Sequence, residues 1–350
     1  MKFNSPFLIA ELSANHNGNF QKAKNLIKIA KMYGADAVKL QTYTPDSMTL
    51  NSNKKYFRIN QGIWKGYKLW DLYNKAKTPY EWHKKLFDYA KKIKIKIFST
   101  PFDEEAVNFL ERLNCPFYKV ASFEMNDLEL IKKISNTGKP IIISTGMASM
   151  DEISEAFYTA KSSGCKDITL LYCVSNYPSK IKDFNLNNIK ILKRKFKCRV
   201  GLSDHSTDSI VAKTAVAMGA EVIEKHIALE NQRIGLDIDF SLKGTEIKKF
   251  RDEINKVKLL IGRNTFYRTK EEKKNKNLRR SIFAIDNIKK GEKFTQFNIK
   301  KIRPGMGIEP KYFKKLINKK SPKNFSKGEP LTNSILKNFF KKIKIDEQHI

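Results

Sequence analysis

The chain has 350 residues, and its 68 lysine and arginine side chains against 36 aspartate and glutamate give a formal net charge of +32. At 41% apolar residues it can bury a large core, which excludes wholesale disorder, and its apolar runs are far shorter than the ~20 residues of a membrane helix. The basic excess alone would suit a polyanion-binding protein. However, 57 of the basic residues are lysines spread along the chain, whereas specific nucleic-acid sites tend to use arginine, so we expect no specific nucleic-acid partner.

The cysteines and the N-terminal segment indicate in which cellular compartment the protein is expected. The four cysteines form no C-x-x-C pair, which is typical of reduced, mostly buried thiols rather than disulfides or zinc ligands. The first residues lead straight into a short strand-like run, without the long apolar region of an export signal. The sequence therefore predicts a cytoplasmic protein with no membrane span.

Strand-like apolar runs alternate with amphipathic helical patterns from residue 7 to about residue 227. The predicted strands are 7–12, 37–43, 95–100, 117–122, 140–146, 168–173, 200–205 and 222–227. Helical patterns between them include 19–33, 81–92, 104–113, 151–162 and 208–218. Such alternation is typical of a parallel sheet with helical crossovers. Eight strands in about 220 residues predict an α/β fold of the closed (β/α)8 TIM-barrel type.

One connection is much longer than the others. Residues 44–79 hold Trp64 and Trp70, and in a barrel they would form an elaborated loop over the active-site face. A packing cap that makes no substrate contact is an equally weighted alternative for this segment.

The character of the chain changes after a last helical pattern over 245–261. Residues 263–280 are polar and dense in charge, which is typical of a linker. Short β-like runs and two Lys-Gly-Glu turns follow, and they predict a small β-rich domain over 281–338. The expected organisation is thus a barrel domain over 1–262, the linker, the small domain and a basic tail over 339–350.

Polar side chains occur at the end of every predicted strand. Active sites of (β/α)8 barrels are built at the C-terminal ends of the strands. One such residue alone could be a satisfied structural group, but eight strands out of eight predict a functional site. In chain order the residues are Glu11; Lys39 and Gln41; Ser99 and Thr100; Lys119 and Ser122; Ser144 and Thr145; Ser175 and Tyr177; Ser203, Asp204 and His205; and Glu224 and His226.

The chemistry of this ring limits its ligands. Two lysines among several hydroxyls suit a phosphate and a carboxylate. His205 and His226 could hold a catalytic metal that keeps open coordination positions, or they could be structural core histidines. Glu11 faces the electropositive centre and could act as general acid or base. These residues predict a metal-assisted enzyme acting on a phosphorylated carboxylic acid and a hydroxyl-rich partner.

For the remaining histidines the sequence gives less indication of a function. His16 lies in the loop after the first predicted strand, where substrate contact and loop structure are equally plausible roles. His83 and His349 are predicted to be ordinary surface histidines.

Ordered motifs give the chain a resemblance to a known family. Over about residues 5–335 it resembles the sialic acid synthase family, whose members carry a TIM barrel followed by an antifreeze-like (SAF) domain. The matching motifs are ELSANHNG (11–18), KLQTY (39–43), STPFD (99–103), YKVAS (118–122), STGMA (144–148), GLSDHS (201–206), EKH (224–226) and, in the small domain, KKGE followed by IRPGMG (302–307).

Several segments favour one branch of the family. They are similar to the pseudaminic acid synthases, with N-acetylneuraminate and legionaminate synthases as the alternatives. The segments are QTYTPDSMTL (41–50), IWKG (63–66), LWDLY (69–73) and TPYEWH (78–83). A polyanion-binding protein and an SAF interaction module on an inactive barrel are two hypotheses from different classes of protein, although Glu11, His205 and His226 argue against the second.

The resemblance implies a reaction and a set of roles. Phosphoenolpyruvate would condense with the open-chain aldehyde of an N-acetylated amino sugar, and phosphate would leave by carbon–oxygen cleavage. His205 and His226 would bind a divalent metal, Mn²⁺ or Mg²⁺, and Glu11 and Lys119 would be catalytic. The phosphoenolpyruvate-binding residues would be Lys39, Thr100, Lys119, Ser122, Ser144, Ser175 and Ser203.

The resemblance also implies a sugar site and a second subunit. The sugar would contact Gln41, Tyr177, Asp237 and Arg303. Of these, Arg303 would reach from the SAF domain into the barrel of the other subunit, which implies a domain-swapped homodimer. Ser175 departs from the family pattern, because many members have asparagine at this place and here Asn176 follows it.

Overall fold

The computed structural model describes residues 5–339, and its contacts divide the chain into two units between Gly262 and Arg263. The first unit is a barrel of eight parallel strands, in which β1 pairs with both β2 and β8 and so closes the sheet. The predicted TIM barrel is therefore confirmed. Its strands are β1 (Phe7–Glu11), β2 (Ala37–Thr42), β3 (Lys96–Pro101), β4 (Tyr118–Val120), β5 (Ile141–Ser144), β6 (Ile168–Cys173), β7 (Arg199–Asp204) and β8 (Val222–Ala228).

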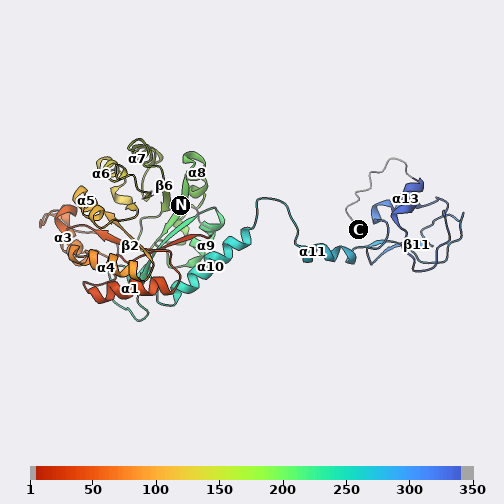
Figure 1. Cartoon of the computed structure of the whole chain (residues 1–350), viewed down its shortest axis with the longest axis horizontal. Helices are drawn as coiled ribbons and strands as arrows, with labels where there is room; N and C mark the ends of the chain where they lie inside the picture. The colour runs from red at the N-terminus through yellow and green to blue at the C-terminus, as the bar shows by residue number, and fades with distance from the viewer. Residues whose placement is uncertain (1–4, 340–350) are drawn as a thin grey trace. The chain divides into compact units, whose positions relative to one another are not determined.

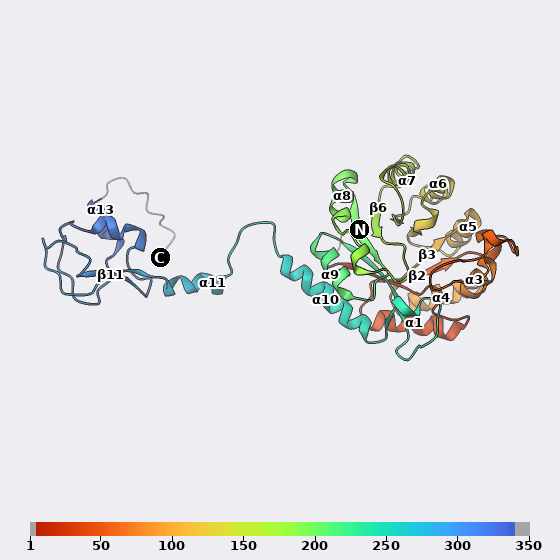
Figure 2. The same cartoon turned by 180° about the vertical axis from the view of Figure 1, so that it is seen from behind.

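Helices surround the barrel, as Figures 1 and 2 show from opposite sides. Each turns an apolar stripe to the strands; α1, for example, buries Ala23, Leu26, Ile27 and Ala30, at the i, i+3, i+4, i+7 spacing of one helix face. Helices α6 and α8 are additions to those singled out from the sequence. The outer helices are α1 (Phe20–Met32), α4 (Tyr80–Lys92), α5 (Glu104–Arg112), α6 (Leu128–Ser135), α7 (Met150–Ser162), α8 (Asn187–Phe196), α9 (Ser209–Ala217) and α10 (Glu246–Ile261).

Strand register brings polar side chains together at one end of the barrel. Glu11 of β1 stands opposite Lys39 of β2 on one side and His226 of β8 on the other. Ser203 of β7 stands opposite Glu224 of β8. Residues more than 200 positions apart in the chain thus become neighbours because the sheet closes.

The insertion, residues 44–79, is partly helical. It contains α2 (Pro45–Met48), the 3₁₀ turn η1 (Lys55–Phe57) and α3 (Leu69–Ala76). The indole Nε1 of Trp70 in α3 donates a hydrogen bond of 2.8 Å to Oδ1 of Asp46 in α2, which ties the two helices together. The predicted long loop therefore has internal structure of its own.

The second unit begins at Arg263 and contains the β-structure that the sequence predicts for its later part. It contains the antiparallel strands β10 (Ser281–Ala284) and β11 (Ile299–Ile302) and several isolated β-bridges. These segments enclose an apolar core separate from that of the barrel. The segment expected to be a linker contains α11 (Lys270–Lys274) and the 3₁₀ turn η5 (Asn275–Leu278). Residues 340–350 of the predicted tail, with His349, lie outside the described residues. Among the residues that are described, no helix has the length and apolarity to span a membrane.

His83 corrects one expectation, because it is fully buried rather than on the surface. Its Nε2 lies 2.8 Å from the Thr42 hydroxyl, and its Nδ1 lies 3.0 Å from the carbonyl oxygen of Pro79. Nearby, Nε2 of the buried His16 lies 3.3 Å from the Thr78 hydroxyl. The insertion ends at these contacts. His83 also shares the buried face of α4 with Leu86, Phe87 and Ala90, at the i, i+3, i+4, i+7 spacing of one helix side.

These two histidines give the barrel a predicted sensitivity to acid. Burial lowers the pKa of His16 and of His83 to about 4, and for His16 the neighbouring His83 contributes as well. A histidine whose pKa falls on folding stabilises the folded state above its unfolded pKa of about 6.5, and that stability is lost as the pH falls toward 4. At pH 5 the expected loss is about 2 kcal/mol per histidine.

The measurement is urea unfolding at pH 7 and pH 5, followed by tryptophan fluorescence, which reports on the barrel because Trp64, Trp70 and Trp82 all lie in it. The wild type should lose more unfolding free energy between the two pH values than His83→Gln does. Equal losses in both proteins would show that His83 does not titrate in this range.

Candidate active site

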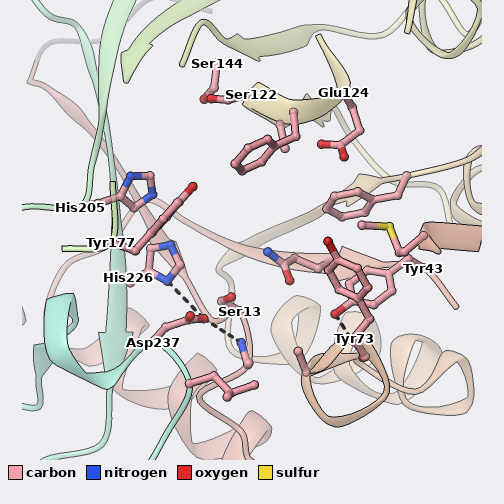
Figure 3. A pocket seen from close by; sticks show the side chains of 18 of the residues that line it. Ser13, Tyr43, Tyr73, Ser122, Glu124, Ser144, Tyr177, His205, His226 and Asp237 are labelled. Carbon is pink, nitrogen blue, oxygen red and sulfur yellow. Dashed lines mark hydrogen bonds and ion pairs between the residues drawn. The ribbon is translucent and has the colours of Figure 1, made fainter. Parts of the chain in front are cut away.

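A cavity of about 410 Å³ opens at the C-terminal ends of the barrel strands. Figure 3 shows side chains from separate strands and loops pointing into it. Among the predicted site residues, those that line it are Lys39, Gln41, Lys119, Ser122, Ser144, Tyr177, Ser203, His205, Glu224, His226 and Asp237.

The rest of the predicted site residues lie elsewhere. Glu11 and Thr100 are buried behind the lining, where both contact the ammonium group of Lys39. Ser175 lies beside the lining residue Cys173, with their oxygen and sulfur atoms 3.8 Å apart. Arg303 is an exposed residue of the second unit.

Four buried ionisable side chains form what we call the charge cluster: Glu11, Lys39, Lys119 and Glu224. Each is at most 4% exposed. Lys39 forms an ion pair with Glu11, and its Nζ lies 3.9 Å from Oε2 of Glu224. The Nζ of Lys119 lies 3.9 Å from the second carboxylate oxygen of Glu224. Two positive and two negative groups therefore face one another across strands β1, β2, β4 and β8.

The two carboxylates of the charge cluster titrate in opposite directions. Burial raises the pKa of Glu11 to about 7; Lys39 opposes this rise and Glu224 adds to it. Burial also acts to raise the pKa of Glu224, but Lys119 and Lys39 together hold that pKa below its usual value. Two carboxylates whose pKa values are pushed apart are the arrangement that proton-transfer sites use, with one able to exchange a proton near neutral pH and the other staying ionised.

The two lysines of the cluster also differ. Burial acts to lower the pKa of Lys39, but the facing carboxylates of Glu11 and Glu224 outweigh it and raise the pKa. For Lys119, burial dominates and lowers the pKa, although Glu224 opposes it. Lys39 is thus held as a cation by its ion pair, whereas the charge of Lys119 is incompletely compensated and would be stabilised by an anionic ligand.

Hydroxyl groups gather around Gly146, which has a φ of +28°. A Cβ atom at this glycine would lie 2.4 Å from the Cβ of Ser122 and 2.6 Å from the Oγ of Ser175. Ser144 lines the cavity as well, and its buried hydroxyl has no hydrogen-bond partner among the described residues. Such hydroxyls are suited to donate to oxygens of an anionic ligand.

His205 and His226 come together at the ends of β7 and β8, with ring centroids 5.3 Å apart. Nδ1 of His205 lies 3.3 Å from the carbonyl oxygen of Val174, which leaves Nε2 as the ring nitrogen available to a ligand. Nδ1 of His226 lies 3.7 Å from Oδ2 of Asp237 and makes no hydrogen bond within the part of the chain that is described. Figure 3 shows this pair.

These two imidazoles fit a metal ion that takes its remaining ligands from water or substrate. Burial lowers the pKa of His226 well below its usual value, with His205 adding to the effect, so this ring is neutral, as a metal ligand must be. Within residues 5–339 no group of three or more histidine, cysteine, aspartate or glutamate side chains is arranged to hold a metal. Two protein ligands leave coordination positions open, as in a catalytic rather than a structural site.

Sequence reasoning missed Glu124, which lies in the 3₁₀ turn η2 (Ser122–Glu124) and lines the cavity. Burial raises its pKa to about 7, while Lys119 opposes the rise. Its Oε2 has no hydrogen-bond partner among the described residues. The only signal for it in the sequence is that it follows Ser122 by two positions, beyond the end of the predicted strand.

The insertion forms one side of the cavity. The indole Nε1 of Trp64 donates a hydrogen bond of 3.0 Å to the carbonyl oxygen of Leu236, in the loop after β8. Its ring lies 5.3 Å from that of Tyr177, and Tyr177 in turn lies 4.4 Å from His205. Of the two interpretations of this segment, the structure thus favours the loop over the site, because it contacts residues of the site and lines its cavity.

Known proteins resemble the chain over nearly its full length. It is 44% identical over 325 residues to pseudaminic acid synthase of Campylobacter jejuni, a match that covers 93% of this chain and 95% of the relative. It is 36% identical over 326 residues to N,N'-diacetyllegionaminic acid synthase of the same organism, with 92% and 97% of the two chains covered. The crystal structure of N-acetylneuraminic acid synthetase from Leptospira borgpetersenii in complex with citrate superposes with a TM-score of 0.70 at 30% identity, covering 78% of this chain and 90% of that one.

Each of the two units matches a known protein family. Residues 26–266 match the NeuB family, and residues 279–337 match the SAF domain. The barrel, the site at its strand ends and these matches agree: the chain belongs to the NeuB family and carries a C-terminal SAF domain.

Proposed function

We propose that the protein is a pseudaminic acid synthase. It condenses phosphoenolpyruvate with 2,4-diacetamido-2,4,6-trideoxy-L-altrose and water to give pseudaminic acid and phosphate. The observation that carries the proposal is the identity of 44% with one synthase of Campylobacter jejuni against 36% with the legionaminic acid synthase of the same bacterium. The site supports it, because lysines and hydroxyls meet two histidines in one cavity.

Phosphoenolpyruvate binds at the charge cluster and the hydroxyls around Gly146. Lys119, whose charge is incompletely compensated, attracts the phosphate or carboxylate, and the free hydroxyl of Ser144 donates a hydrogen bond to it. Lys39 donates a hydrogen bond of 3.2 Å to the Thr100 hydroxyl, and its positive charge lies at the bottom of the phosphoenolpyruvate subsite. Ser122, Ser175 and Ser203 complete this subsite.

Glu11 is the proton-transfer residue. Its pKa of about 7 allows it to accept and return a proton near neutral pH. The backbone N–H of Ser13 donates a hydrogen bond of 2.7 Å to Glu11 Oε1, and together with the Lys39 ion pair it orients the carboxylate. Carbon three of phosphoenolpyruvate attacks the aldehyde carbon of the sugar, and the aldehyde oxygen takes up a proton. Water then adds to the oxocarbenium centre at carbon two and gives its proton to Glu11, after which the carbon–oxygen bond to phosphate breaks.

NeuB-family synthases are generally metal-dependent. In this chain His205 and His226 would hold the ion, Mn²⁺ or Mg²⁺. When bound, a divalent ion supplies Lewis acidity that polarises the aldehyde of the sugar.

Gln41, Tyr177 and Asp237 line the same cavity as the histidines and bind the sugar. Glu124 contributes a further carboxylate, which accepts a hydrogen bond from a sugar N–H or O–H group. All four line the same cavity. With phosphoenolpyruvate as co-substrate and four free thiols, we place the protein in the cytoplasm.

The active form is a domain-swapped homodimer in which Arg303 reaches the sugar site of the other subunit. Two exposed regions support it. Leu259 and Leu260, at the end of α10, are 80% and 84% exposed, and Phe266 is 88% exposed, a run of apolar side chains that a partner subunit would cover. Arg303 itself is exposed, and a guanidinium can recognise an acetamido oxygen.

Phosphate release from phosphoenolpyruvate tests the proposed function. In the presence of manganese, the trideoxy altrose sugar should release phosphate, and N-acetylmannosamine should release little. A chelator should stop the reaction, and His205→Ala should stop it while the protein still folds and unfolds cooperatively. Turnover with N-acetylmannosamine alone would move the protein to the N-acetylneuraminate branch, and turnover with neither sugar would contradict the proposal.

Gly146→Ala tests the phosphoenolpyruvate subsite. The new methyl group would displace Ser122 and Ser175, so the KM for phosphoenolpyruvate should rise about tenfold or more while the KM for the sugar changes little. The control is Gly164→Ala, because Gly164 also has a positive φ, +96°, but has no atom within 4 Å of the added Cβ. An unchanged KM for phosphoenolpyruvate in Gly146→Ala would show that these hydroxyls do not bind it.

Subunit complementation tests the role of Arg303. Glu11→Gln and Arg303→Ala should each be inactive alone. Mixed dimers contain one intact barrel that receives Arg303 from the other subunit, so co-refolding the two variants in equal amounts should restore about one quarter of wild-type activity. If Arg303 served its own barrel, no mixed dimer would have a complete site and no activity would return.

A further inference from the structure

Helix α3 presents an apolar face to the cavity. Leu69, Leu72, Tyr73 and Ala76 are spaced i, i+3, i+4 and i+7, which places them on one side of the helix, and all four line the cavity. An amphipathic helix normally buries such a stripe in the protein core. None of these four residues belongs to the apolar core of the barrel or packs against it. We call this surface the α3 wall.

The surroundings of the α3 wall are apolar as well. Met48 and Ile59 of the insertion line the same cavity, with Phe102 and Phe123 from the neighbouring loops. No charged side chain of residues 44–79, all of which are described, lines it. Figure 3 shows Tyr43 and Tyr73 across the pocket from His205 and His226. The cavity therefore has a charged side and a side lined mostly by apolar and aromatic side chains, where burial raises the pKa of Tyr73 and Glu124 lies close enough to add to the rise.

The wall is held in place before any ligand binds. The hydrogen bond from Trp70 to Asp46 joins α3 to α2, and the ring of Tyr73 packs 5.9 Å from that of Tyr43, at the end of β2. The Tyr43 ring packs in turn 5.2 Å from Phe102, after β3. These contacts connect α3 to two barrel strands and make the wall a preformed surface.

The chemistry of the sugar decides which part of it meets this wall. Its aldehyde reacts beside the histidines and the charge cluster, so the opposite end of the carbon chain extends toward the apolar side. In a 6-deoxy sugar that end is a methyl group, whereas ordinary hexosamines carry a hydroxymethyl group. A hydroxyl pressed against Leu69, Leu72 and Ala76 loses its hydrogen bonds to water and gains none from these side chains.

Resting on the proposed function, we infer that the α3 wall binds the methyl-bearing end of the sugar and selects 6-deoxy sugars. The inference assigns the insertion a role in specificity that is separate from the reaction at the charged side.

The test compares two sugars that differ only at carbon six: the trideoxy altrose sugar and its 6-hydroxy counterpart. Wild-type kcat/KM should favour the 6-deoxy sugar by about 10- to 100-fold, the range an added hydroxyl costs in an apolar pocket. Ala76→Ser and Leu69→Asn place a polar group in the wall, so each should reduce that preference about three- to tenfold. The KM for phosphoenolpyruvate should stay unchanged, because it binds on the other side of the cavity.

Leu50→Asn is the matched control, because Leu50 belongs to the insertion but is 66% exposed and does not line the cavity. It should keep the wild-type preference. Two results would overturn the inference while leaving the proposed function intact: a wild type that turns over both altrose sugars equally, or wall variants that fold normally and keep the full preference. A wild type active only with N-acetylmannosamine would instead overturn the proposed function, and the assignment of the wall with it.

Discussion

The site depends on the electrostatic balance among four buried charges at the mouth of the barrel. Glu11, Lys39, Lys119 and Glu224 come from four strands, and for each of them the neighbours of opposite sign favour the charged form against burial. Closure of the barrel between β1 and β8 is what brings both Glu11 and Glu224 to Lys39. A single isolated charge at this depth would lose its proton or gain one, so the cluster functions as a unit rather than as four separate residues.

The cluster also explains how one site can both transfer a proton and bind an anion. Glu224 stays ionised between two lysines and fixes their positions, while Glu11, with its raised pKa, can exchange a proton. The remaining positive charge on Lys119 is directed at an anionic ligand. The two histidines stand at the edge of this cluster, where the sugar can meet phosphoenolpyruvate, and the insertion closes the opposite side with apolar and aromatic groups.

Sequence reasoning predicted the barrel and most of the cavity lining because both follow from simple periodicities. Once eight strands are assigned, the rule that active sites lie at their C-terminal ends selects residues such as Lys39, Ser144 and His226 without any contact information. What it missed depends on tertiary structure. Glu124 lies on a turn that no period describes. His83, in contrast, shares the buried face of α4 with Leu86, Phe87 and Ala90, so the helical period could have placed it inside. Likewise, the apolar stripe of α3 is visible in the sequence, but whether it faces the core or a cavity is decided by the packing around it.

The charge cluster is proposed to hold phosphoenolpyruvate. Water, deprotonated by Glu11, then adds to carbon two, and phosphate leaves with the bridging oxygen. Turnover of phosphoenolpyruvate labelled with ¹⁸O at that bridging position, with mass spectrometry of both products, tests this step most directly. We predict that the label appears in the released phosphate and that the new oxygen at carbon two of the sugar acid comes from solvent. Label retained in the sugar acid, with unlabelled phosphate, would mean that the phosphorus–oxygen bond breaks and would contradict this mechanism.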